Sequence, residues 1–467
     1  MPQLSLFNSL MREKQPFLPL NPEHVKLYAC GPTVYNYAHI GNARMAVVFD
    51  LLSRVLKTHF PKVTYVSNIT DVDDKIIAAS VETGEAIDVI TQKYTAIYNE
   101  DMAALGCAQP DIQPKATTHI GEMIALIERL IEKGHAYEVQ GDNGGHVLFH
   151  VPSFPAYGAL SGRSRDEQIA GARVEVASYK RDPADFILWK PSSDDEPGWD
   201  SPWGRGRPGW HIECSAMAEK HLGLPFDIHG GGADLKFPHH ENEIAQSCCA
   251  LDHEGGALDD ASAFAKFWVH NGFVTVEGQK MSKSLGNFLT VHDLVGLHSG
   301  EALRLTLLSA HYRQPLDWSE DKVQQNKKQL DRFYQRLDDM KDMDVVEVAI
   351  PSGVLGALCD DLNTPQAMAA LNALLKEDNS PVLKGQLLSA GRVLGILQED
   401  PAQWLGFDID AADGAGGVGA DFNALLEERA AAKADKNWAR ADEIRDLIAA
   451  QGYEIVDSRE GSKVRKT

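Results

Sequence analysis

The sequence predicts an α/β protein, in which a doubly wound parallel sheet carries an insertion and is followed by an α-helical bundle and a small C-terminal domain. Two observations lead to this prediction. Residues 24–66 read as strand, helix and strand in succession, which is the order of a βαβ unit. After about residue 300 the apolar residues recur almost entirely at helical spacing.

The first half of the sheet domain begins with a strand. Residues 24–30 alternate between apolar and polar side chains until Gly31-Pro32 breaks the pattern. Apolar residues from Met45 to Leu56 then recur at helical spacing, and residues 63–66 return to strand character. Because a helix joins the two strands, the sheet is expected to be parallel. A further amphipathic helix is predicted over residues 120–131.

The composition of the sequence changes between residues 134 and 208, where short strand-like segments are separated by many Gly, Pro and Asp residues. This segment is predicted to be an insertion between the halves of a Rossmann-like domain. The second half resumes with a helix over residues 211–221 and a strand over residues 225–229, with Gly230 to Gly232 behind it. Another helix should begin near Pro238, because proline suits a first helical turn.

The composition excludes several classes of protein. The chain has 467 residues, with 45 Lys and Arg against 67 Asp and Glu, so its formal net charge is -22. A chain-wide basic surface for nucleic acid is therefore excluded, and only local basic patches can serve that purpose. No run approaches the roughly 18 apolar residues of a membrane span, and the first residues lack the layout of a signal peptide. A cytoplasmic protein without membrane contact is expected.

Two short motifs suit phosphate binding. His39-Ile40-Gly41-Asn42 precedes the first helix, where backbone N–H groups and the helix dipole attract anions and glycine permits a close approach. Lys280 to Asn287, with the sequence KMSKSLGN, is a short loop whose two lysines and two serines could close over a polyphosphate. Taken singly, the first motif could be a plain turn with a surface histidine, and the second a solvated loop.

Together the two motifs resemble the paired signatures of class I aminoacyl-tRNA synthetases. From about residue 5 to the C-terminus the chain is similar to the cysteinyl-tRNA synthetase family, most clearly at CGPTVY (30–35), NITDVDDK (68–75), GWHIECSAM (209–217) and the stretch 229–246. One departure is that Asn42 stands where the general class pattern has a second histidine. Asparagine can still donate a hydrogen bond to phosphate, but it cannot act as a charged donor.

The resemblance implies an order of domains along the chain. The seven regions are the first half of the catalytic nucleotide-binding domain (1–133), a connective insertion (134–208), the second half of the catalytic domain (209–270), a stem-contact region with the KMSKS loop (271–318), a helical tRNA-binding bundle (319–407), a linker (408–420) and a C-terminal anticodon-recognition domain (421–467). The linker is rich in Gly, Ala and Asp, as flexible connections are.

A metal site is predicted from scattered residues. His239 and Glu243 are four apart and so share one face of a helix. Cys30 and Cys214 lie far from them without a CxxC pair, so spacing alone is weak evidence for zinc. The family resemblance implies that Cys30, Cys214, His239 and Glu243 together hold one Zn²⁺ per chain. The order of residues 239–243 lacks the His-Glu-x-x-His of zinc peptidases, which disfavours that alternative.

The remaining cysteines are expected to be reduced and buried. Six cysteines are too few for a disulfide framework in a chain of this length. Buried free cysteine is common as a small packing residue. The four cysteines outside the predicted metal site are assigned to this role: Cys107, Cys248, Cys249 and Cys359.

The chemistry of the implied substrate explains why a metal would be useful. Cysteine differs from serine only by sulfur in place of oxygen, and a hydrophobic pocket separates such small differences by only about 1–3 kcal/mol. Zinc deprotonates a thiol that it coordinates, whereas an alcohol is a far weaker and harder ligand. We therefore expect the metal to select the substrate thiolate, so that no separate editing site is needed.

The resemblance implies the ATP-dependent ligation of L-cysteine to tRNA(Cys) through a cysteinyl-adenylate, with release of AMP and pyrophosphate. The implied catalytic residues are His39 and Asn42 at the α-phosphate, and Lys280 and Lys283 at the leaving pyrophosphate, with Mg²⁺ on the nucleotide. Lys283 and three further residues are expected to contact ATP: Gly41, Gly231 and Asp234. Four residues are expected to line the amino-acid pocket: Thr33, Thr70, Trp210 and His211. A solvated turn is the alternative for Asp234, and core packing for Trp210.

The tRNA contacts are expected in the C-terminal third. Residues 322–336 carry five basic residues and one acid, a local patch suited to phosphate, although a solvated helix face would look the same. Trp438, Asp442 and Asp457 match positions at which the family reads the anticodon by stacking and base-edge hydrogen bonds. Helix packing is the alternative for Trp438. A monomer is expected, because no dimerisation element is evident.

Two rival functions are weaker. A related ligase that joins cysteine to an amino-sugar would share the catalytic half but would need no anticodon module, and the segment from residue 421 onward speaks against it. A tRNA-binding regulator without catalysis is disfavoured, because the predicted phosphate and metal residues are all present.

Overall fold

The structure, a computed structural model, describes residues 1–141, 144–171, 179–251, 260–282, 285–406, 418–450, 453–458 and 461–466. These residues form two compact units. The first comprises residues 1–323, 352–370 and 393–395, and the second comprises residues 324–351, 371–392 and 396–467. Among the described residues, no helix combines the length and apolar character needed to cross a lipid bilayer.

The centre of the first unit is a four-stranded parallel sheet. Its strands are β3 (Val25–Ala29), β4 (Val63–Ser67), β9 (Phe226–Gly232) and β10 (Ala265–Asn271), and they lie in the order β10-β9-β3-β4. The predicted doubly wound parallel sheet is therefore confirmed. The chain leaves β3 toward one edge and β9 toward the other, so a crevice opens at the carboxyl ends of these two neighbours.

Helices lie on both faces of this sheet. The helix α1 (Ile40–His59) connects β3 to β4, and α7 (His239–Ala250) leads from β9 toward β10. Both helices were predicted, and α7 begins directly after Pro238 as expected. In β3 the expected alternation is only partial, because Tyr28 is as buried as Leu27. A central parallel strand is covered on both faces and so loses its polar side.

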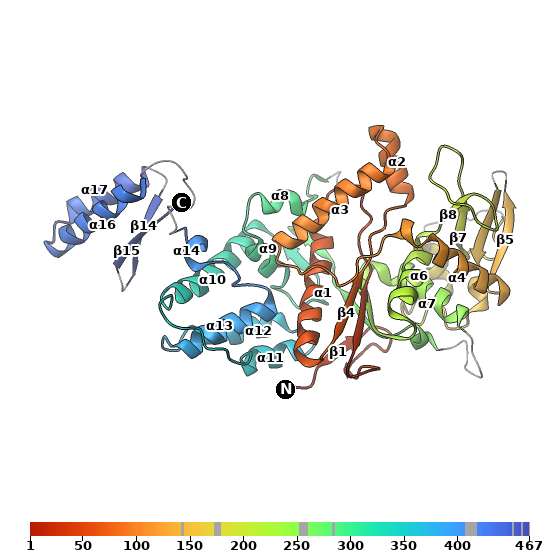
Figure 1. Ribbon diagram of the computed structural model, residues 1–467, viewed down its shortest axis with the longest axis horizontal. Coiled ribbons are helices and arrows are strands. Elements are labelled where there is room, and N and C mark those ends of the chain that lie inside the picture. The colour runs from red at the N-terminus through yellow and green to blue at the C-terminus, as the bar shows by residue number, and fades with distance from the viewer. Residues whose placement is uncertain are drawn as a thin grey trace. The chain divides into compact units, whose positions relative to one another are not determined.

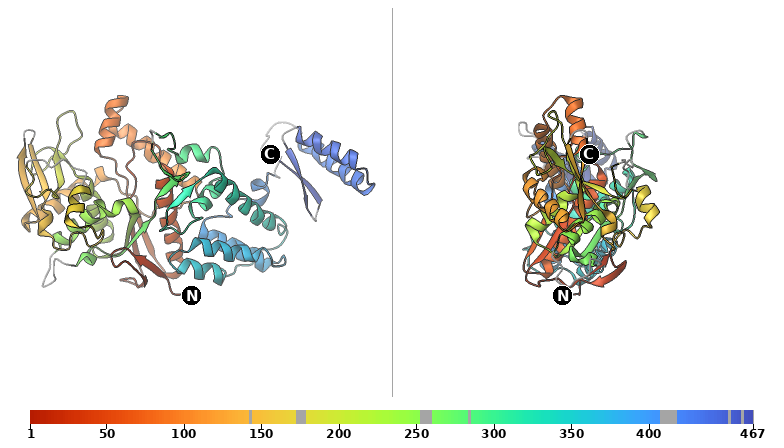
Figure 2. Two further views of the ribbon diagram at one scale, coloured as in Figure 1. Left: turned by 180° about the vertical axis from the view of Figure 1, so that it is seen from behind. Right: turned by 90° about the vertical axis from the view of Figure 1, so that its right-hand side faces the viewer.

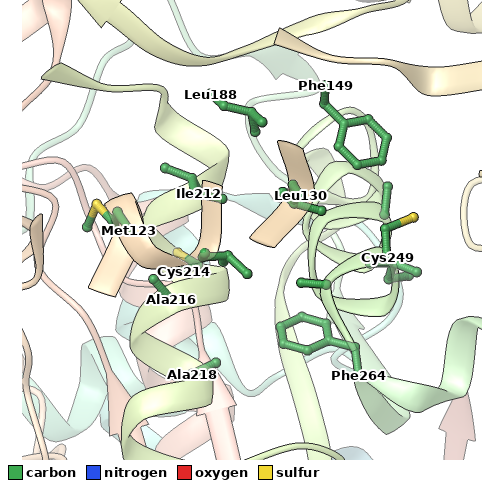
Figure 3. Close-up of a cluster of buried hydrophobic side chains, with 14 of the residues drawn as sticks. Met123, Leu130, Phe149, Leu188, Ile212, Cys214, Ala216, Ala218, Cys249 and Phe264 are labelled. Carbon is green, nitrogen blue, oxygen red and sulfur yellow. The ribbon is translucent and has the colours of Figure 1, made fainter. Parts of the chain in front are cut away.

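Two further helices build the core beneath the crevice. They are α4 (Ile120–Glu132) and α6 (Trp210–Leu222), both close to their predicted bounds. Figure 3 shows Met123 and Leu130 of α4 gathered with Ile212 of α6, Cys249 of α7 and other buried apolar residues. The predicted packing role of Cys249 agrees with this position.

The insertion forms a sheet of its own. The four antiparallel strands β5 (Ala136–Gly141), β6 (Gly144–Phe149), β7 (Phe186–Pro191) and β8 (Gly206–Pro208) pair in sequence order, and α5 (Arg165–Gly171) lies between β6 and β7. Figures 1 and 2 show this sheet on the far side of α4, α6 and α7 from the central sheet. Buried Phe149 and Leu188 join the insertion to the common core.

The other elements of the first unit surround the central sheet. They are β1 (Ser5–Asn8), β2 (Glu13–Pro16), α2 (Asp74–Thr83), α3 (Ile87–Ala104), β11 (Val274–Val276), β12 (Gln279–Lys280), α8 (Val291–Val295), α9 (Gly300–Leu307), β13 (Leu316–Trp318) and α11 (Ser352–Cys359). The strands β11 and β12 form a hairpin that ends at the predicted lysine loop. This hairpin was not predicted.

Helices dominate the chain after residue 318, as predicted. Three of these helices each have residues in both units: α10 (Glu320–Asp338), α12 (Thr364–Leu374) and α13 (Pro381–Leu394). The short helix α14 (Pro401–Trp404) lies wholly in the second unit. Within the second unit, Tyr334 of α10 stacks on Trp404 of α14 with ring centroids 4.5 Å apart. The Trp404 indole also donates to Asp331 at 2.8 Å, which fixes α14 against α10.

The C-terminal end of the second unit has a small core of its own. It consists of α16 (Val418–Ala434), α17 (Trp438–Ala449), β14 (Tyr453–Ser458) and β15 (Gly461–Lys466), whose two helices and hairpin appear together in Figure 1. Their buried apolar residues are Phe422, Ile444, Ile448, Tyr453 and Val464. Residues 408–417 of the predicted linker lie outside the described residues, and α16 already begins within its last three positions. The hairpin was not predicted.

Candidate metal and nucleotide site

A cluster of buried metal-ligating side chains lies at the crevice between β3 and β9. Cys30 follows β3 directly, Cys214 comes from α6, and His239 and Glu243 come from the first turns of α7. All four residues are at most 3% exposed. The fold therefore brings together the four predicted ligands, which are distant in sequence.

The geometry of this cluster suits a tetrahedral metal ion. Cys30 Sγ lies 3.6 Å from Cys214 Sγ and 3.5 Å from Glu243 Oε1, and His239 Nε2 lies 3.0 Å from Glu243 Oε1. The four ligand atoms all lie within 4.8 Å of one another. Tetrahedral zinc with bonds of about 2.3 Å to sulfur and about 2.1 Å to oxygen would place two sulfurs about 3.75 Å apart and sulfur and oxygen about 3.6 Å apart.

Further donors surround the four ligands. His229 Nε2 lies 3.1 Å from Glu243 Oε2 and 3.7 Å from Cys30 Sγ. With Cys30, His240 and Glu243 it forms a second group whose ligand atoms lie within 4.8 Å. The sequence analysis did not select His229, although its position near the carboxyl end of a predicted parallel strand was a signal that could have identified it.

Several buried polar atoms around the cluster have no hydrogen-bond partner among the described residues. They include His229 Nδ1 and His240 Nε2. Such groups are rare in protein interiors, because an unpaired buried polar atom costs about 1–3 kcal/mol. Their concentration at one place fits a site that is completed by an ion.

The charges of the cluster depend on close contacts between its members. Burial raises the pKa of the Cys30 thiol, while the hydrogen bond from Cys30 lowers the pKa of Cys214 to about 6. Burial alone would lower the pKa of His239, but Glu243 outweighs it and raises that pKa to about 10. A metal ion must displace the protons on Cys30 and His239, so metal binding should release protons.

The backbone beside Cys30 requires a glycine. A Cβ added to Gly31 would lie 1.7 Å from the carbonyl oxygen of Asn68, so no other residue allows this approach of the chain to the end of β4. The Gly31 N–H donates to Asn68 Oδ1 at 2.9 Å. Thr33 and Thr70 then form a parallel bridge, which places these two predicted pocket residues side by side.

The other two predicted pocket residues contact a metal-ligand candidate. Trp210 stacks on His239 with ring centroids 4.3 Å apart, and it is 40% exposed, so it is not a core packing residue. His211 Nδ1 lies 3.0 Å from His239 Nδ1. Thr70 Oγ1 donates to Glu213 Oε2 at 3.0 Å, a buried contact that the sequence did not predict. Trp210 and His211 thus adjoin the cluster through their contacts with His239.

The first signature forms a reciprocal cap at the start of α1. His39 is the N-cap, and its Nδ1 accepts a hydrogen bond from Gly41 N at 3.0 Å, while Asn42 Oδ1 accepts from His39 N at 3.2 Å. Because Nδ1 is an acceptor, the neutral imidazole carries its proton on Nε2. The Asn42 oxygen is already used, so its amide group remains as the donor. Both side chains can therefore donate to an anion at this helix terminus.

The segment after the lysine loop packs against this cap. Ile40 N donates to Leu289 O at 3.1 Å, Val291 N donates to Ala38 O at 2.8 Å, and the rings of His39 and Phe288 lie 5.4 Å apart. The two predicted signatures are therefore adjacent in space. Lys280 is exposed at the end of β12, and Lys283 lies outside the described residues.

The remaining predicted ATP residues lie at the end of β9. Gly230 to Gly232 belong to this strand and do not follow it, so the predicted strand end was wrong. The mistake arose because glycine is rare in strands, whereas here β9 is central and hydrogen-bonded on both sides. Burial lowers the pKa of His39, and the charge of Asp234 opposes this shift.

The predicted anticodon residues lie in the small C-terminal part of the second unit. Trp438 is 59% exposed at the start of α17, which does not support its alternative role in helix packing. Asp442 forms an ion pair with Arg445 at 2.9 Å. Asp457 lies 2.7 Å from Arg429 and 2.8 Å from Lys433, so its carboxylate is held within the domain.

The basic patch of α10 is smaller than its sequence suggests. Lys327 pairs with Asp331 at 2.9 Å, Lys322 donates to the Asp317 carbonyl, and Arg336 donates to the Glu377 carbonyl. Lys328 and Arg332 are exposed and lie four residues apart on one face. These two cations are the part of the patch best placed to meet phosphate.

Comparisons with known proteins agree with this arrangement. Residues 16–328 match the family described as tRNA synthetases class I (C) catalytic domain, and residues 415–465 match the cysteinyl-tRNA ligase anticodon binding domain. A cysteine–tRNA ligase of Rhodospirillum rubrum is 53% identical over 473 residues, which cover 99% of each chain. One of Xanthomonas campestris is 55% identical over 470 residues, again covering 99% of each chain.

Solved structures show the same fold at low sequence identity. A methionyl-tRNA synthetase of Mycobacterium tuberculosis, in complex with methionyl-adenylate, superimposes with a TM-score of 0.58 at 14% identity, covering 82% of this chain and 94% of that one. A LeuRS of Agrobacterium radiobacter gives a TM-score of 0.56 at 12% identity and covers 86% of both chains.

Proposed function

The chain belongs to the cysteine–tRNA ligase family of class I aminoacyl-tRNA synthetases, and we propose that it ligates L-cysteine to tRNA(Cys) through a cysteinyl-adenylate, using ATP and releasing AMP and pyrophosphate. The observation that carries this proposal is the buried Cys–Cys–His–Glu cluster beside a phosphate-binding helix terminus. Few other reactions need a thiol-selective site and a phosphate site in one crevice.

Cys30, Cys214, His239 and Glu243 are proposed to hold one zinc ion. Their softness favours this metal, because thiolate and imidazole ligands suit zinc and not the harder magnesium or calcium. When bound, Zn²⁺ supplies a soft Lewis acid that favours a deprotonated thiol over the hydroxyl of serine. Glu243 is fixed for this role by His229, whose Nε2 is 3.1 Å from its second oxygen.

The amino acid is proposed to lie beside the cluster. The partly exposed ring of Trp210 would contact its apolar part, and the hydroxyls of Thr33 and Thr70, which a parallel bridge holds together, would contact its polar groups. Thr70 Oγ1 donates to Glu213 Oε2 and accepts from Asn68 Nδ2 at 3.3 Å, so one lone pair of Thr70 Oγ1 remains to accept from a substrate ammonium group. His211 supports His239 from behind and so limits the positions that His239 can adopt.

ATP is proposed to bind along the end of β9 and the N-terminus of α1. His39 Nε2–H and the Asn42 amide would donate to the α-phosphate, where negative charge increases during attack by the cysteine carboxylate. The N-terminal dipole of α1 would add to this stabilisation. Gly41, Gly231 and Asp234 are proposed to contact the nucleotide, and Lys280 and Lys283 to neutralise the leaving pyrophosphate, with Mg²⁺ on ATP.

Transfer to tRNA is proposed to use the helical and C-terminal regions. Lys328 and Arg332 of α10 would contact the phosphate backbone, and Trp438, Asp442 and Asp457 would contact the anticodon. For Asp457, the contact would require its carboxylate to share its hydrogen bonds with a base, because Arg429 and Lys433 already hold it. The working state is proposed to be a cytoplasmic monomer.

Two linked assays test the proposal. Cysteine-dependent exchange of pyrophosphate into ATP tests adenylate formation, and charging of purified tRNA(Cys) tests transfer. The proposal predicts activity in both assays, with serine and alanine inactive in the first. Exchange without charging, together with transfer of cysteine to an amino-sugar, would instead support the rival ligase. Binding of tRNA without exchange would support a regulator.

A further inference from the structure

Arg44 is a buried cation to which the proposed site assigns no role. It lies on α1, two residues after Asn42, and its side chain is fully buried. The guanidinium donates to three backbone carbonyls: Nη1 lies 2.9 Å from Gly272 O and 2.8 Å from Phe273 O, and Nη2 lies 3.2 Å from His311 O. None of its hydrogen-bond partners among the described residues is a carboxylate.

The need to satisfy buried carbonyls does not explain this arginine. Each of the three carbonyls has a second donor: the side-chain amide of Asn271 for Gly272 O, Leu316 N for Phe273 O and Gln314 N for His311 O. The Nε atom of Arg44 itself is buried and has no hydrogen-bond partner in the described part of the chain. An apolar side chain would avoid the desolvation cost of a buried guanidinium. The arginine therefore indicates a use for its fixed set of donors.

The three carbonyls lie at the base of the hairpin that leads into the lysine loop. Residues 272–273 connect β10 to β11, and β11 pairs with β12 and with β13. His311 belongs to the segment that leads into β13, and Gly272 N donates to Tyr312 O of that segment at 2.7 Å. A Cβ on Gly272 would lie 2.5 Å from Gln314 O, so glycine permits this close approach. One planar guanidinium thus holds both segments against α1.

The chain that leaves the lysine loop is attached to the same helix. Residues 289–291 hydrogen-bond to residues 38–40 around the cap of α1. The proposed phosphate donors His39 and Asn42 belong to this cap. Both sides of the lysine loop are therefore attached to the N-terminal turns of α1, and Arg44 makes the attachment on the incoming side.

We propose that Arg44 is a positioning residue, which fixes the lysine loop relative to the phosphate donors at the start of α1. This inference rests on the proposed ATP-dependent activation of cysteine. Lysines that neutralise a leaving pyrophosphate must be placed accurately, because a displacement of about 1 Å can cost about a hundredfold in rate. The planar fork of arginine presents its donors in fixed directions, whereas a lysine ammonium is a single point charge that cannot reproduce them. Because the hydrogen bonds of Arg44 go to the hairpin base, its loss should impair the ATP step and spare cysteine binding.

The test compares Arg44→Lys, which keeps the charge, with Arg44→Met, which removes it. The matched control is Arg304→Met, because Arg304 is equally buried and also donates to backbone carbonyls, which here belong to Leu105 and Leu394 outside the hairpin. Pyrophosphate exchange is measured at varied ATP and at varied cysteine. Deuterium uptake of residues 272–282 is followed by mass spectrometry, and melting temperatures are recorded for all proteins.

We expect both Arg44 variants to lower kcat/KM for ATP about tenfold or more and to leave the KM for cysteine unchanged. Deuterium uptake in β11 and β12 should become faster in both. Arg304→Met should lower the melting temperature without either change. If Arg44→Met does not fold, Arg44→Lys decides, because it retains the charge and the long side chain.

Several results would overturn the inference. One is wild-type kcat/KM for ATP in Arg44→Lys, which would assign any effect of Arg44→Met to charge and not to position. Another is an equal loss for ATP and for cysteine in the Arg44 variants and in Arg304→Met, which would make Arg44 a residue of general stability. Unchanged deuterium uptake in both Arg44 variants would show that the attachment itself is wrong. Absence of pyrophosphate exchange in the wild type would instead overturn the proposed function.

Discussion

Asn42 provides a direct test of how the first signature works, because its two side-chain atoms have separate roles. Its oxygen accepts from His39 N at 3.2 Å and so caps α1, while its amide group is the proposed donor to the α-phosphate. Asn42→Asp keeps the acceptor and places a carboxylate at a helix N-terminus, which the dipole favours. Asn42→Ala removes both functions. The two variants therefore separate stability from catalysis.

The magnitudes follow from these two contacts. Loss of the capping acceptor in Asn42→Ala should cost about 1 kcal/mol of the free energy of unfolding, and Asn42→Asp should cost almost none. Loss of a hydrogen bond to a charged phosphate is worth about 1.5–3 kcal/mol, or roughly a ten- to hundredfold lower rate of adenylate formation. The carboxylate of Asn42→Asp would also repel the phosphate, so this variant should lose more activity than Asn42→Ala.

The assay pairs urea denaturation with cysteine-dependent pyrophosphate exchange at varied ATP. The expected order of stability is wild type and Asn42→Asp above Asn42→Ala, while the expected order of exchange rate is wild type, Asn42→Ala and then Asn42→Asp. The KM for cysteine should stay unchanged, because Asn42 lies at the nucleotide side of the crevice. A wild-type exchange rate in Asn42→Asp would refute the donor role and leave Asn42 as a cap only.

Three further outcomes are expected. Dialysis against a strong chelator should abolish cysteine-dependent exchange and one equivalent of Zn²⁺ should restore it; full exchange in zinc-free protein would contradict the metal proposal. Arg304→Met should lower the free energy of unfolding in urea by about 3 kcal/mol, because buried Arg304 lies 2.5 Å from Asp50 and also donates to Leu394 O. The matched variant Arg54→Met, which removes the other partner of Asp50, should lower the free energy of unfolding less, since Arg54 is partly exposed. Arg429 holds the pKa of Asp457 below its usual range. The Asp457–Arg429 ion pair therefore stabilises the C-terminal domain above the unfolded pKa near 4, and this stabilisation is lost as the pH falls. Circular dichroism should show the C-terminal domain weakening below about pH 4 in the wild type and less so in Asp457→Asn.

Much of the central sheet was predictable, because its signals are local. The helix α1 and the strands β3 and β4 each show their own periodicity, and the helix between the strands requires a parallel sheet. The end of β9 was wrong because its glycines are held by hydrogen bonds to two neighbouring strands, which a local pattern does not contain. The β11–β12 hairpin was missed because its strands, of three and two residues, are too short to show a period of two.

The candidate site was predicted through resemblance more than through spacing. His239 and Glu243 share a helical face, but nothing local links them to Cys30 or Cys214, which only the order of the strands brings near. His229 was missed because, apart from its place near the carboxyl end of a predicted strand, it looks like an ordinary residue of a buried strand. Its contacts with Cys30 and Glu243 become visible only in the fold.

The two sides of the crevice depend on the same pair of chain connections. The connection from β3 to α1 carries Cys30 at its start and His39 at its end, and the connection from β9 to α7 is flanked by Gly231 at the end of β9 and by His239 at the start of α7. Each connection therefore contributes to the metal side and to the nucleotide side. Because β3 and β9 are hydrogen-bonded neighbours, the separation of a metal-held thiol from the α-phosphate is set by the spacing of the sheet and not by a mobile loop. Selection of cysteine and its activation thus rely on one rigid element, so a change in the core that displaces either strand should impair both together.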